Sequence, residues 1–147
     1  MNVVFDLDGT LANCEHRNHL VHGVEKPDWE TYYKLCPLDK PIWPVIELAA
    51  GLIRHGNRIE IWTGRSEVAR ADTVTWLNTV GLKALRGELL MRPIGDHRPD
   101  TELKAEWLAD ARETGFAPEL VIEDRKRMID FWRSQGLVAL QCADGNF

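Results

Sequence analysis

The sequence predicts one α/β domain built on a mostly parallel, doubly wound β-sheet with helices on both faces. Short apolar runs of strand length alternate with longer segments of helical periodicity along all 147 residues, and such alternation is typical of parallel sheets. Hydrophobic residues make up 44% of the chain and charged residues 28%, a balance that supports a folded core and argues against disorder. No repeat or linker divides the chain, so residues 1–147 are predicted to form a single domain.

Five apolar runs are predicted to be strands. Residues 3–5 are apolar without a break, which is typical of a strand that is covered on both faces. In the run 58–62, Ile59 and Ile61 fall on one face of the strand. The other three predicted strands are residues 89–91, 120–122 and 137–140.

Four segments between these strands have the apolar spacing of helices. Residues 45–53 are followed by His55 and Gly56, a cation and then a glycine, as is common where a helix ends. The other predicted helices cover residues 67–80, 102–112 and 125–135.

The segment after the first strand interrupts this alternation. Residues 14–40 are polar and contain two prolines, so we expect an insertion of loop with one short helix. Its aromatic residues Trp29, Tyr32 and Tyr33 are expected to form a small packed cluster under the loop. Stacking of one of these rings on a nucleobase is the functional alternative.

Polar clusters follow three of the predicted strands. They are the sequences DLDGT at residues 6–10, TGR at 63–65 and EDR at 123–125. Lys104 lies near the start of the helix that follows the third strand. Because ligands bind beyond the carboxyl ends of parallel strands, we expect these four segments to converge on one site.

The residue types in these clusters suit phosphoryl transfer. Asp6 can attack phosphorus as a nucleophile and form an acyl phosphate, and Asp8 can protonate the leaving oxygen and then activate water. Thr63 and Lys104 can bind and neutralise the phosphoryl oxygens. Gly9 permits the tight turn that brings backbone amides toward the phosphate.

The acidic residues of the same clusters can bind Mg²⁺, which prefers oxygen ligands and offsets the charge of a phosphate. The predicted ligands are Asp6, Asp8, Glu123 and Asp124. Taken one at a time, these clusters could be simple turns or helix caps. Independent turns need not meet at one edge of a sheet, however, so their combination favours an active site.

The ordered pattern of DxDGT, a threonine, a lysine and an acidic pair resembles the haloacid-dehalogenase (HAD) superfamily, and the resemblance covers the whole chain. Its fold is a Rossmann-like sheet. In that superfamily an aspartate at the position of Asp8 is typical of phosphatases. The resemblance therefore implies a phosphatase with a minimal cap domain or none.

A further set of residues resembles the 3′-phosphatase domain of bacteriophage-type polynucleotide kinase. In that family the positions that match Arg17, Arg65, Asp100 and Lys104 are active-site residues, and Gly64 belongs to the same TGR match. Arg65 could instead pair with a carboxylate such as Asp100 and stiffen the rim of the site. Two features depart from the family: Glu123 stands where it has aspartate, and the GxxxxGK[ST] motif of a kinase half does not occur.

We therefore expect a Mg²⁺-dependent phosphomonoesterase that forms an aspartyl phosphate and acts on a nucleic-acid 3′-phosphate or a nucleotide. No large cap domain fits between Asp8 and Thr63 or between Thr63 and Lys104, so the site should admit a polymer end. The net charge of -5 argues against stable binding of long duplexes. Free nucleotides or another small phosphometabolite are the alternative substrates.

Two functions of other classes fit the sequence less well. A phospho-accepting receiver domain shares the parallel sheet and acidic site, but it accepts phosphate on an aspartate after the third strand, and none directly follows residues 89–91. An inactive binding module is disfavoured because every expected catalytic residue is present.

The cysteine pattern and the apolar runs predict a cytoplasmic protein without a membrane partner. Three scattered cysteines form no CxxC pair, as is usual for reduced thiols. No apolar run approaches the roughly 20 residues that span a bilayer, and the first residues resemble a strand rather than a leader. The protein is expected to be a monomer or a homodimer.

Overall fold

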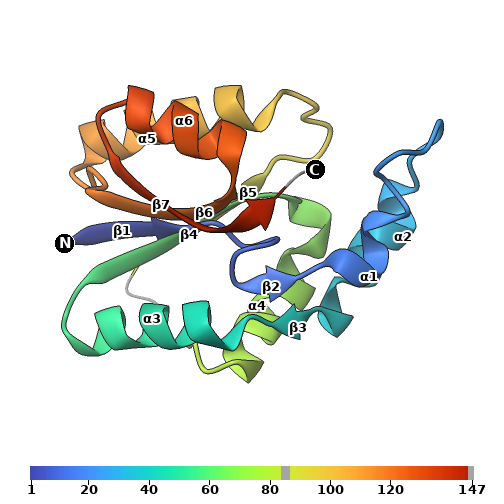
Figure 1. Cartoon of the computed structure of the whole chain (residues 1–147), viewed down its shortest axis with the longest axis horizontal. Helices are drawn as coiled ribbons and strands as arrows, with labels where there is room; N and C mark the ends of the chain where they lie inside the picture. Colours follow the sequence, from blue (N-terminus) through green and yellow to red (C-terminus); the bar gives the residue numbers. More distant parts are fainter. Residues whose placement is uncertain (84–86, 146–147) are drawn as a thin grey trace.

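Five parallel strands form the central sheet of the computed structural model, which describes residues 1–83 and 87–145 (Figure 1). Their order across the sheet is β5-β4-β1-β6-β7, and every pairing between neighbours is parallel. The predicted fold class is therefore confirmed. The strands are β1 (Asn2–Phe5), β4 (Arg58–Ser66), β5 (Leu89–Arg92), β6 (Leu120–Arg125) and β7 (Val138–Gly145).

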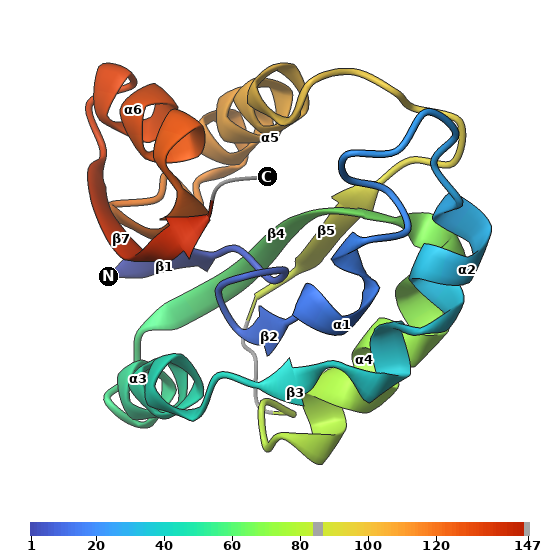
Figure 2. The same cartoon turned by 45° about the vertical axis from the view of Figure 1, so that its right-hand side comes forward.

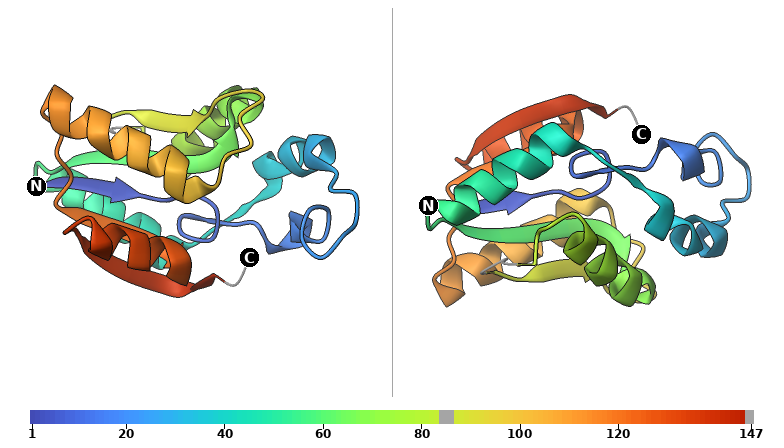
Figure 3. Two further views of the ribbon diagram at one scale, coloured as in Figure 1. Left: turned by 90° about the horizontal axis from the view of Figure 1, so that it is seen from above. Right: turned by 90° about the horizontal axis from the view of Figure 1, so that it is seen from below.

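The central strand β1 is buried on both faces, as its unbroken apolar sequence predicts. Val3 and Phe5 belong to one buried cluster and Val4 to another, because successive side chains of a strand point to opposite faces. The first cluster lies under α3 (Trp43–Arg54) and α4 (Arg70–Thr79). The second lies under α5 (Asp100–Thr114) and α6 (Lys126–Ser134), on the other side of the sheet (Figure 3).

Three strands run further than the apolar pattern indicates. The strand predicted at 137–140 begins at Val138 and continues to Gly145. The predicted strand 58–62 continues to Ser66 and the predicted strand 120–122 continues to Arg125. Both extensions contain a shift in pairing register, between Thr63 and Ser66 in β4 and between Glu123 and Arg125 in β6. The apolar pattern reports burial rather than backbone pairing, so it ends where the functional polar residues begin.

The insertion contains more regular structure than the one short helix that we expected. It includes α1 (Glu15–Asn18), α2 (Trp29–Lys34) and the 3-10 turn η1 (Cys36–Leu38). A short antiparallel ribbon of β2 (Ala12–Asn13) and β3 (Lys40–Pro41) joins it to the domain (Figure 2). Strands of two residues are too short to produce a readable alternation, which is why the sequence does not reveal them.

Helix starts also differ slightly from the prediction. The helix expected at 67–80 begins with the 3-10 turn η2 (Glu67–Ala69), where the Ser66 hydroxyl accepts a hydrogen bond from the amide of Val68. Helix α5 starts at Asp100, directly after Pro99. No helix in the described part of the chain is both long enough and apolar enough to cross a membrane.

Candidate active site

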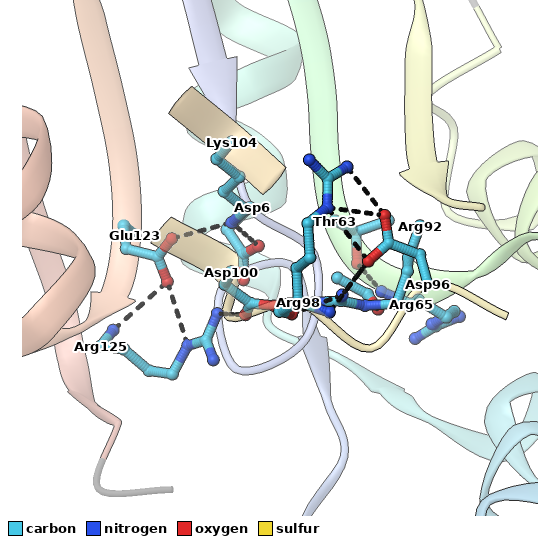
Figure 4. Close-up of polar contacts among 11 residues, drawn as sticks. Asp6, Thr63, Arg65, Arg92, Asp96, Arg98, Asp100, Lys104, Glu123 and Arg125 are labelled. Atoms are coloured by element: carbon cyan, nitrogen blue, oxygen red, sulfur yellow. Dashed lines mark hydrogen bonds and ion pairs between the residues drawn. The ribbon is translucent and has the colours of Figure 1, made fainter. Parts of the chain in front are cut away.

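The predicted site residues converge at the carboxyl ends of β1, β4 and β6 (Figure 4). Lys104 on α5 extends to this point, and its Nζ lies 2.7 Å from Oδ1 of Asp6 and 3.1 Å from Oε2 of Glu123. All three side chains are buried. Lys104 is therefore not a solvent-exposed helix residue, because its side chain is enclosed between two carboxylates. Burial of its ammonium group without these carboxylates would be unfavourable.

The loop after β1 holds Asp6 and Asp8 in place. The backbone amides of Thr10, Leu11 and Ala12 donate to the carbonyl of Leu7, at 3.2, 2.9 and 2.9 Å. Gly9 has a φ of 85°, in the left-handed region that favours glycine. A Cβ at this position would lie 2.2 Å from Oδ2 of Asp124. Glycine is therefore required here both for the turn and for the close approach of the two loops.

Asp6, Glu123 and Asp124 form a buried acidic cluster. Each offers a carboxylate oxygen, and these oxygens lie within 4.8 Å of one another. Burial and the neighbouring charge of Glu123 raise the pKa of Asp6 to about 7. Burial, Asp6 and Glu123 raise the pKa of Asp124 to about 8. The positive charge of Lys104 is therefore too little to offset three carboxylates in this space.

The donor set of this cluster fits a hard divalent cation such as Mg²⁺, since all the donors are carboxylate oxygens. Oδ2 of Asp124 is buried and accepts no hydrogen bond from the described residues. A buried carboxylate oxygen without a hydrogen-bond donor is typical of an atom that binds a cation. The carboxylate of Asp8, also a predicted ligand, lies outside this cluster and points to two arginines.

Asp8 belongs to a second network, with two arginines and one further aspartate. Its Oδ1 accepts hydrogen bonds from Nη2 of Arg17, at 2.6 Å, and from Nη2 of Arg65. Both guanidinium groups also donate to Asp39, at 2.7 Å and 2.8 Å. Arg17, Arg65 and Asp39 are buried. Two cations and two anions alternate, so the network is neutral and its charges satisfy one another.

The arginines control the protonation of Asp8. Burial acts to raise the pKa of this carboxyl, but the charges of Arg65 and Arg17 outweigh it and hold the pKa below its usual range. Asp8 is therefore ionised before substrate arrives. In that state it can accept a proton, whereas proton donation requires a change in its surroundings.

Asp100 pairs with arginines other than Arg65. Its two oxygens accept hydrogen bonds from Arg92 and Arg125, and burial is outweighed by Arg125 and Lys104, which lower its pKa to about 2. A Cβ on Gly64 would lie 2.8 Å from Oδ1 of Asp100. The alternative in which Arg65 pairs with a carboxylate is found with Asp8 and Asp39 as partners, and not with Asp100. Gly64 leaves room for Asp100 against β4.

A cavity of about 520 Å³ opens over Asp6 and Asp8. Arg17 and Lys104, although predicted to be in the site, are buried behind it and reach it through the carboxylates that they bind. Thr63 lines the cavity, and its hydroxyl oxygen accepts a hydrogen bond from the amide of Arg65 at 3.1 Å, which leaves the hydroxyl proton available. The predicted residues in the cavity wall are Asp6, Asp8, Thr63, Gly64, Arg65 and Asp100.

Several residues of the site could not be identified from the sequence. Asp39 is an isolated aspartate in the insertion and belongs to no motif, yet it anchors both Arg17 and Arg65. The aromatic residues of α2 form the packed cluster that we expected, with ring centroids 5.5 to 5.9 Å apart. They also line the cavity, which the packing interpretation did not include.

Several solved structures share the fold of this chain. Two chains from structures described as the Pnkp1/Rnl/Hen1 RNA repair complex and the Pnkp1/Rnl/Hen1 complex are 26% and 24% identical to this chain, with TM-scores of 0.75 and 0.80. They match 99% of this chain, which spans 43% and 46% of their length. A class C acid phosphatase from Bacillus anthracis shares the fold at 14% identity and a TM-score of 0.68, with 99% and 67% of the two chains covered.

The family comparison covers the complete sequence. The model of the polynucleotide kinase PNKP phosphatase domain matches residues 1–147, which includes the DxDGT loop, the TGR segment, Lys104 and the acidic pair. HAD-superfamily hydrolases are among the structural neighbours, such as one from Geobacter sulfurreducens at 14% identity and a TM-score of 0.62, with 95% and 85% of the chains covered. The chain thus belongs to the family of PNKP phosphatase domains, within the HAD phosphatases.

Proposed function

We propose that this phosphatase hydrolyses phosphomonoesters through an aspartyl phosphate on Asp6, and that its substrates are 3′-phosphate ends of nucleic acid. The observation that carries the proposal is the position of Asp6 in the cavity wall, with Lys104 on one oxygen. No described residue donates a hydrogen bond to the other oxygen, Oδ2, which is therefore available to attack phosphorus.

The acidic cluster supports a requirement for Mg²⁺. Asp6, Glu123 and Asp124 are the residues that would hold the ion. When bound, it would supply positive charge that lets a dianionic phosphate approach the Asp6 carboxylate. Thr63, through its free hydroxyl proton, and Lys104 would stabilise charge on the phosphoryl oxygens.

Asp8 is proposed to move the protons. Its ionised state suits the second half of the reaction, in which it takes a proton from the water that attacks the acyl phosphate. In the first half it must carry a proton to the leaving 3′ oxygen. The negative charge of a phosphate beside Arg65 would weaken the hold of the arginine on Asp8, so that Asp8 binds a proton more readily.

The 3′-phosphate assignment is supported by the family and by the open cavity over Asp6. A substrate panel tests it: 3′-phosphorylated RNA and DNA strands, their 5′-phosphorylated counterparts, nucleoside monophosphates and glycerol phosphate, each with Mg²⁺ and with EDTA. RNA is included because one of the similar structures is described as an RNA repair complex. We expect the 3′-phosphorylated strands to give the highest kcat/KM, and only with Mg²⁺. Faster turnover of mononucleotides would favour the alternative of a small phosphometabolite, and full activity in EDTA would contradict the metal role.

Location and assembly remain predictions. All three cysteines are unpaired, with Cys14 and Cys36 buried. Unpaired thiols are usual under the reducing conditions of the cytoplasm, so they support the proposed location. A monomer or homodimer without a membrane partner is proposed, and gel filtration with light scattering would test the oligomeric state.

A further inference from the structure

A second hollow adjoins the catalytic cavity and differs from it in chemistry. It has a volume of about 410 Å³. It lies between α2, the turn η2 and the segment that follows β5, which come together on one side of the molecule (Figure 2). Four residues line both spaces, namely Trp29, Tyr33, Ser66 and Gly95. The two spaces are therefore adjacent and share part of their wall.

The wall of this hollow is apolar and exposed. Trp29 is 47% exposed, Val68 60% and Ile94 72%. Large apolar side chains gathered at one place on a surface are typical of a binding site. None of these three belongs to the core clusters of the described residues.

Trp29 is held in place by two neighbouring aromatic rings. Its ring stacks on that of Tyr33, with centroids 5.9 Å apart and 26° between the planes. Tyr32 meets Trp29 edge-on at 5.5 Å and is itself buried. The indole is thus supported from within the insertion and does not have to be ordered when a ligand arrives, which lowers the entropic cost of binding.

The charges around the hollow disfavour a phosphate there. Lys34 is the one cation among its described lining residues, and it is bonded to Glu30 at 2.6 Å. Asp72 adds a negative charge. Arginines instead line the neighbouring catalytic cavity, where Asp6 lies. The pair of spaces therefore accepts a molecule with a phosphate at one end and a flat, uncharged group at the other.

We propose that the second hollow, which we call the base subsite (Trp29, Tyr33, Val68 and Ile94), binds the nucleobase of the nucleoside that carries the 3′-phosphate, by stacking on Trp29. This inference rests on the proposed function, because it assumes a phosphate at Asp6. It adds a specificity to that function: the enzyme distinguishes ends that carry a terminal base from ends that lack one. Any base can stack on the ring of Trp29.

The test compares two strands that differ only in the terminal base. One is a 3′-phosphorylated oligonucleotide, and the other has an abasic sugar at the phosphorylated terminus. The wild-type protein should show a kcat/KM about 5- to 140-fold higher on the complete strand, which is the range for one base stacked on an aromatic ring. The readout is the ratio of the two values.

Three variants locate this ratio in the base subsite. Trp29→Leu keeps an apolar side chain for packing against Tyr33 but lacks a flat face, and it should bring the ratio close to one. Trp29→Phe should restore most of the ratio. Trp43→Leu is the matched control, because Trp43 is 53% exposed and lines neither space, and it should leave the ratio unchanged.

The possible failures are distinguishable. A wild-type ratio of one, or a ratio that Trp29→Leu leaves intact, would overturn the base subsite and not the proposed function. Absence of turnover on both strands, with turnover of glycerol phosphate, would overturn the 3′-end function on which the subsite depends. A ratio that collapses equally in Trp43→Leu would also count against the subsite.

Discussion

Single side chains decide the chemistry of this site, and Asp6 is the first of them. It is the one carboxylate that both belongs to the acidic cluster and lines the cavity. Asp6→Asn preserves the shape and the contact with Lys104 but replaces the nucleophile with an amide. We expect kcat to fall by about 10³-fold or more, while urea unfolding stays similar. Asp110→Asn, at an exposed position on α5, is the control, and wild-type turnover in Asp6→Asn would remove the nucleophile assignment.

Asp39 tests the energetic weight of the buried network. Removing its side chain leaves Arg17 and Arg65 buried with half of their counter-charge. Breaking a buried ion pair in this way costs about 3–5 kcal/mol, so Asp39→Ala should lower the free energy of unfolding by that amount. Glu30→Ala removes the exposed pair with Lys34 and should cost less than about 1 kcal/mol. If urea denaturation gave the same loss in free energy of unfolding for both variants, the buried network would contribute no more to stability than the exposed pair.

The same residues show what the sequence could predict. Asp6, Asp8, Thr63 and Asp124 were identifiable because each belongs to a motif at the end of an apolar run. Lys104 was identifiable because it lies near the start of the helix that follows the third predicted strand. Asp39 was not, because its partners are 22 and 26 residues away and pairing across such a distance leaves no local pattern. For the same reason the carboxylates that bind Arg65 are Asp8 and Asp39, 57 and 26 residues away, rather than Asp100, the example that the sequence suggested.

At the scale of elements, the site depends on close contact between the β1 loop and the end of β6. Gly9 and Gly145 approach the Asp124 carboxylate from two elements, and a Cβ on either would lie within 2.2 Å of its Oδ2. The apolar pattern located both strands but not this contact, which arises only when the sheet is assembled. Glycine at these places is needed for space, a property that periodicity does not report.

Gly9→Ala should therefore affect function more than stability. The left-handed φ costs about 1 kcal/mol for alanine, and the methyl group must also displace Asp124. We expect a Mg²⁺ titration to show a higher half-saturating concentration and at least an order-of-magnitude loss of activity. Gly56→Ala has a similar φ of 80° and no atom within 4 Å of its Cβ, so it should show the backbone cost alone. Equal Mg²⁺ requirements in the two variants would contradict the steric argument.

At the scale of the whole molecule, the acidic charge and the basic cavity wall act in opposite directions. A net charge of -5 repels a long polyanion. The cavity wall nevertheless contains Arg92, Arg98, Arg125 and Arg127. The first three bind carboxylates of the chain, which uses up most of their charge. Strand binding is thus expected to involve few phosphates and to depend weakly on salt.

Arg127 makes this expectation testable. It is exposed at the start of α6, lines the catalytic cavity and has no carboxylate partner among the described residues. Each phosphate contact on a single strand contributes a slope of about 0.7 in a plot of log affinity against log salt. Arg127→Ala should therefore reduce that slope by about 0.7 and weaken binding of a 3′-phosphorylated strand by about fivefold to tenfold near 50 mM salt. Measurements in the Asp6→Asn background avoid turnover.

Arg112→Ala is the matched control, because Arg112 is an exposed arginine that lines neither space and its replacement changes the net charge by the same amount. An equal effect in that variant would show that Arg127 acts only through the net charge of the protein. An unchanged slope in Arg127→Ala would exclude Arg127 as a contact to the strand.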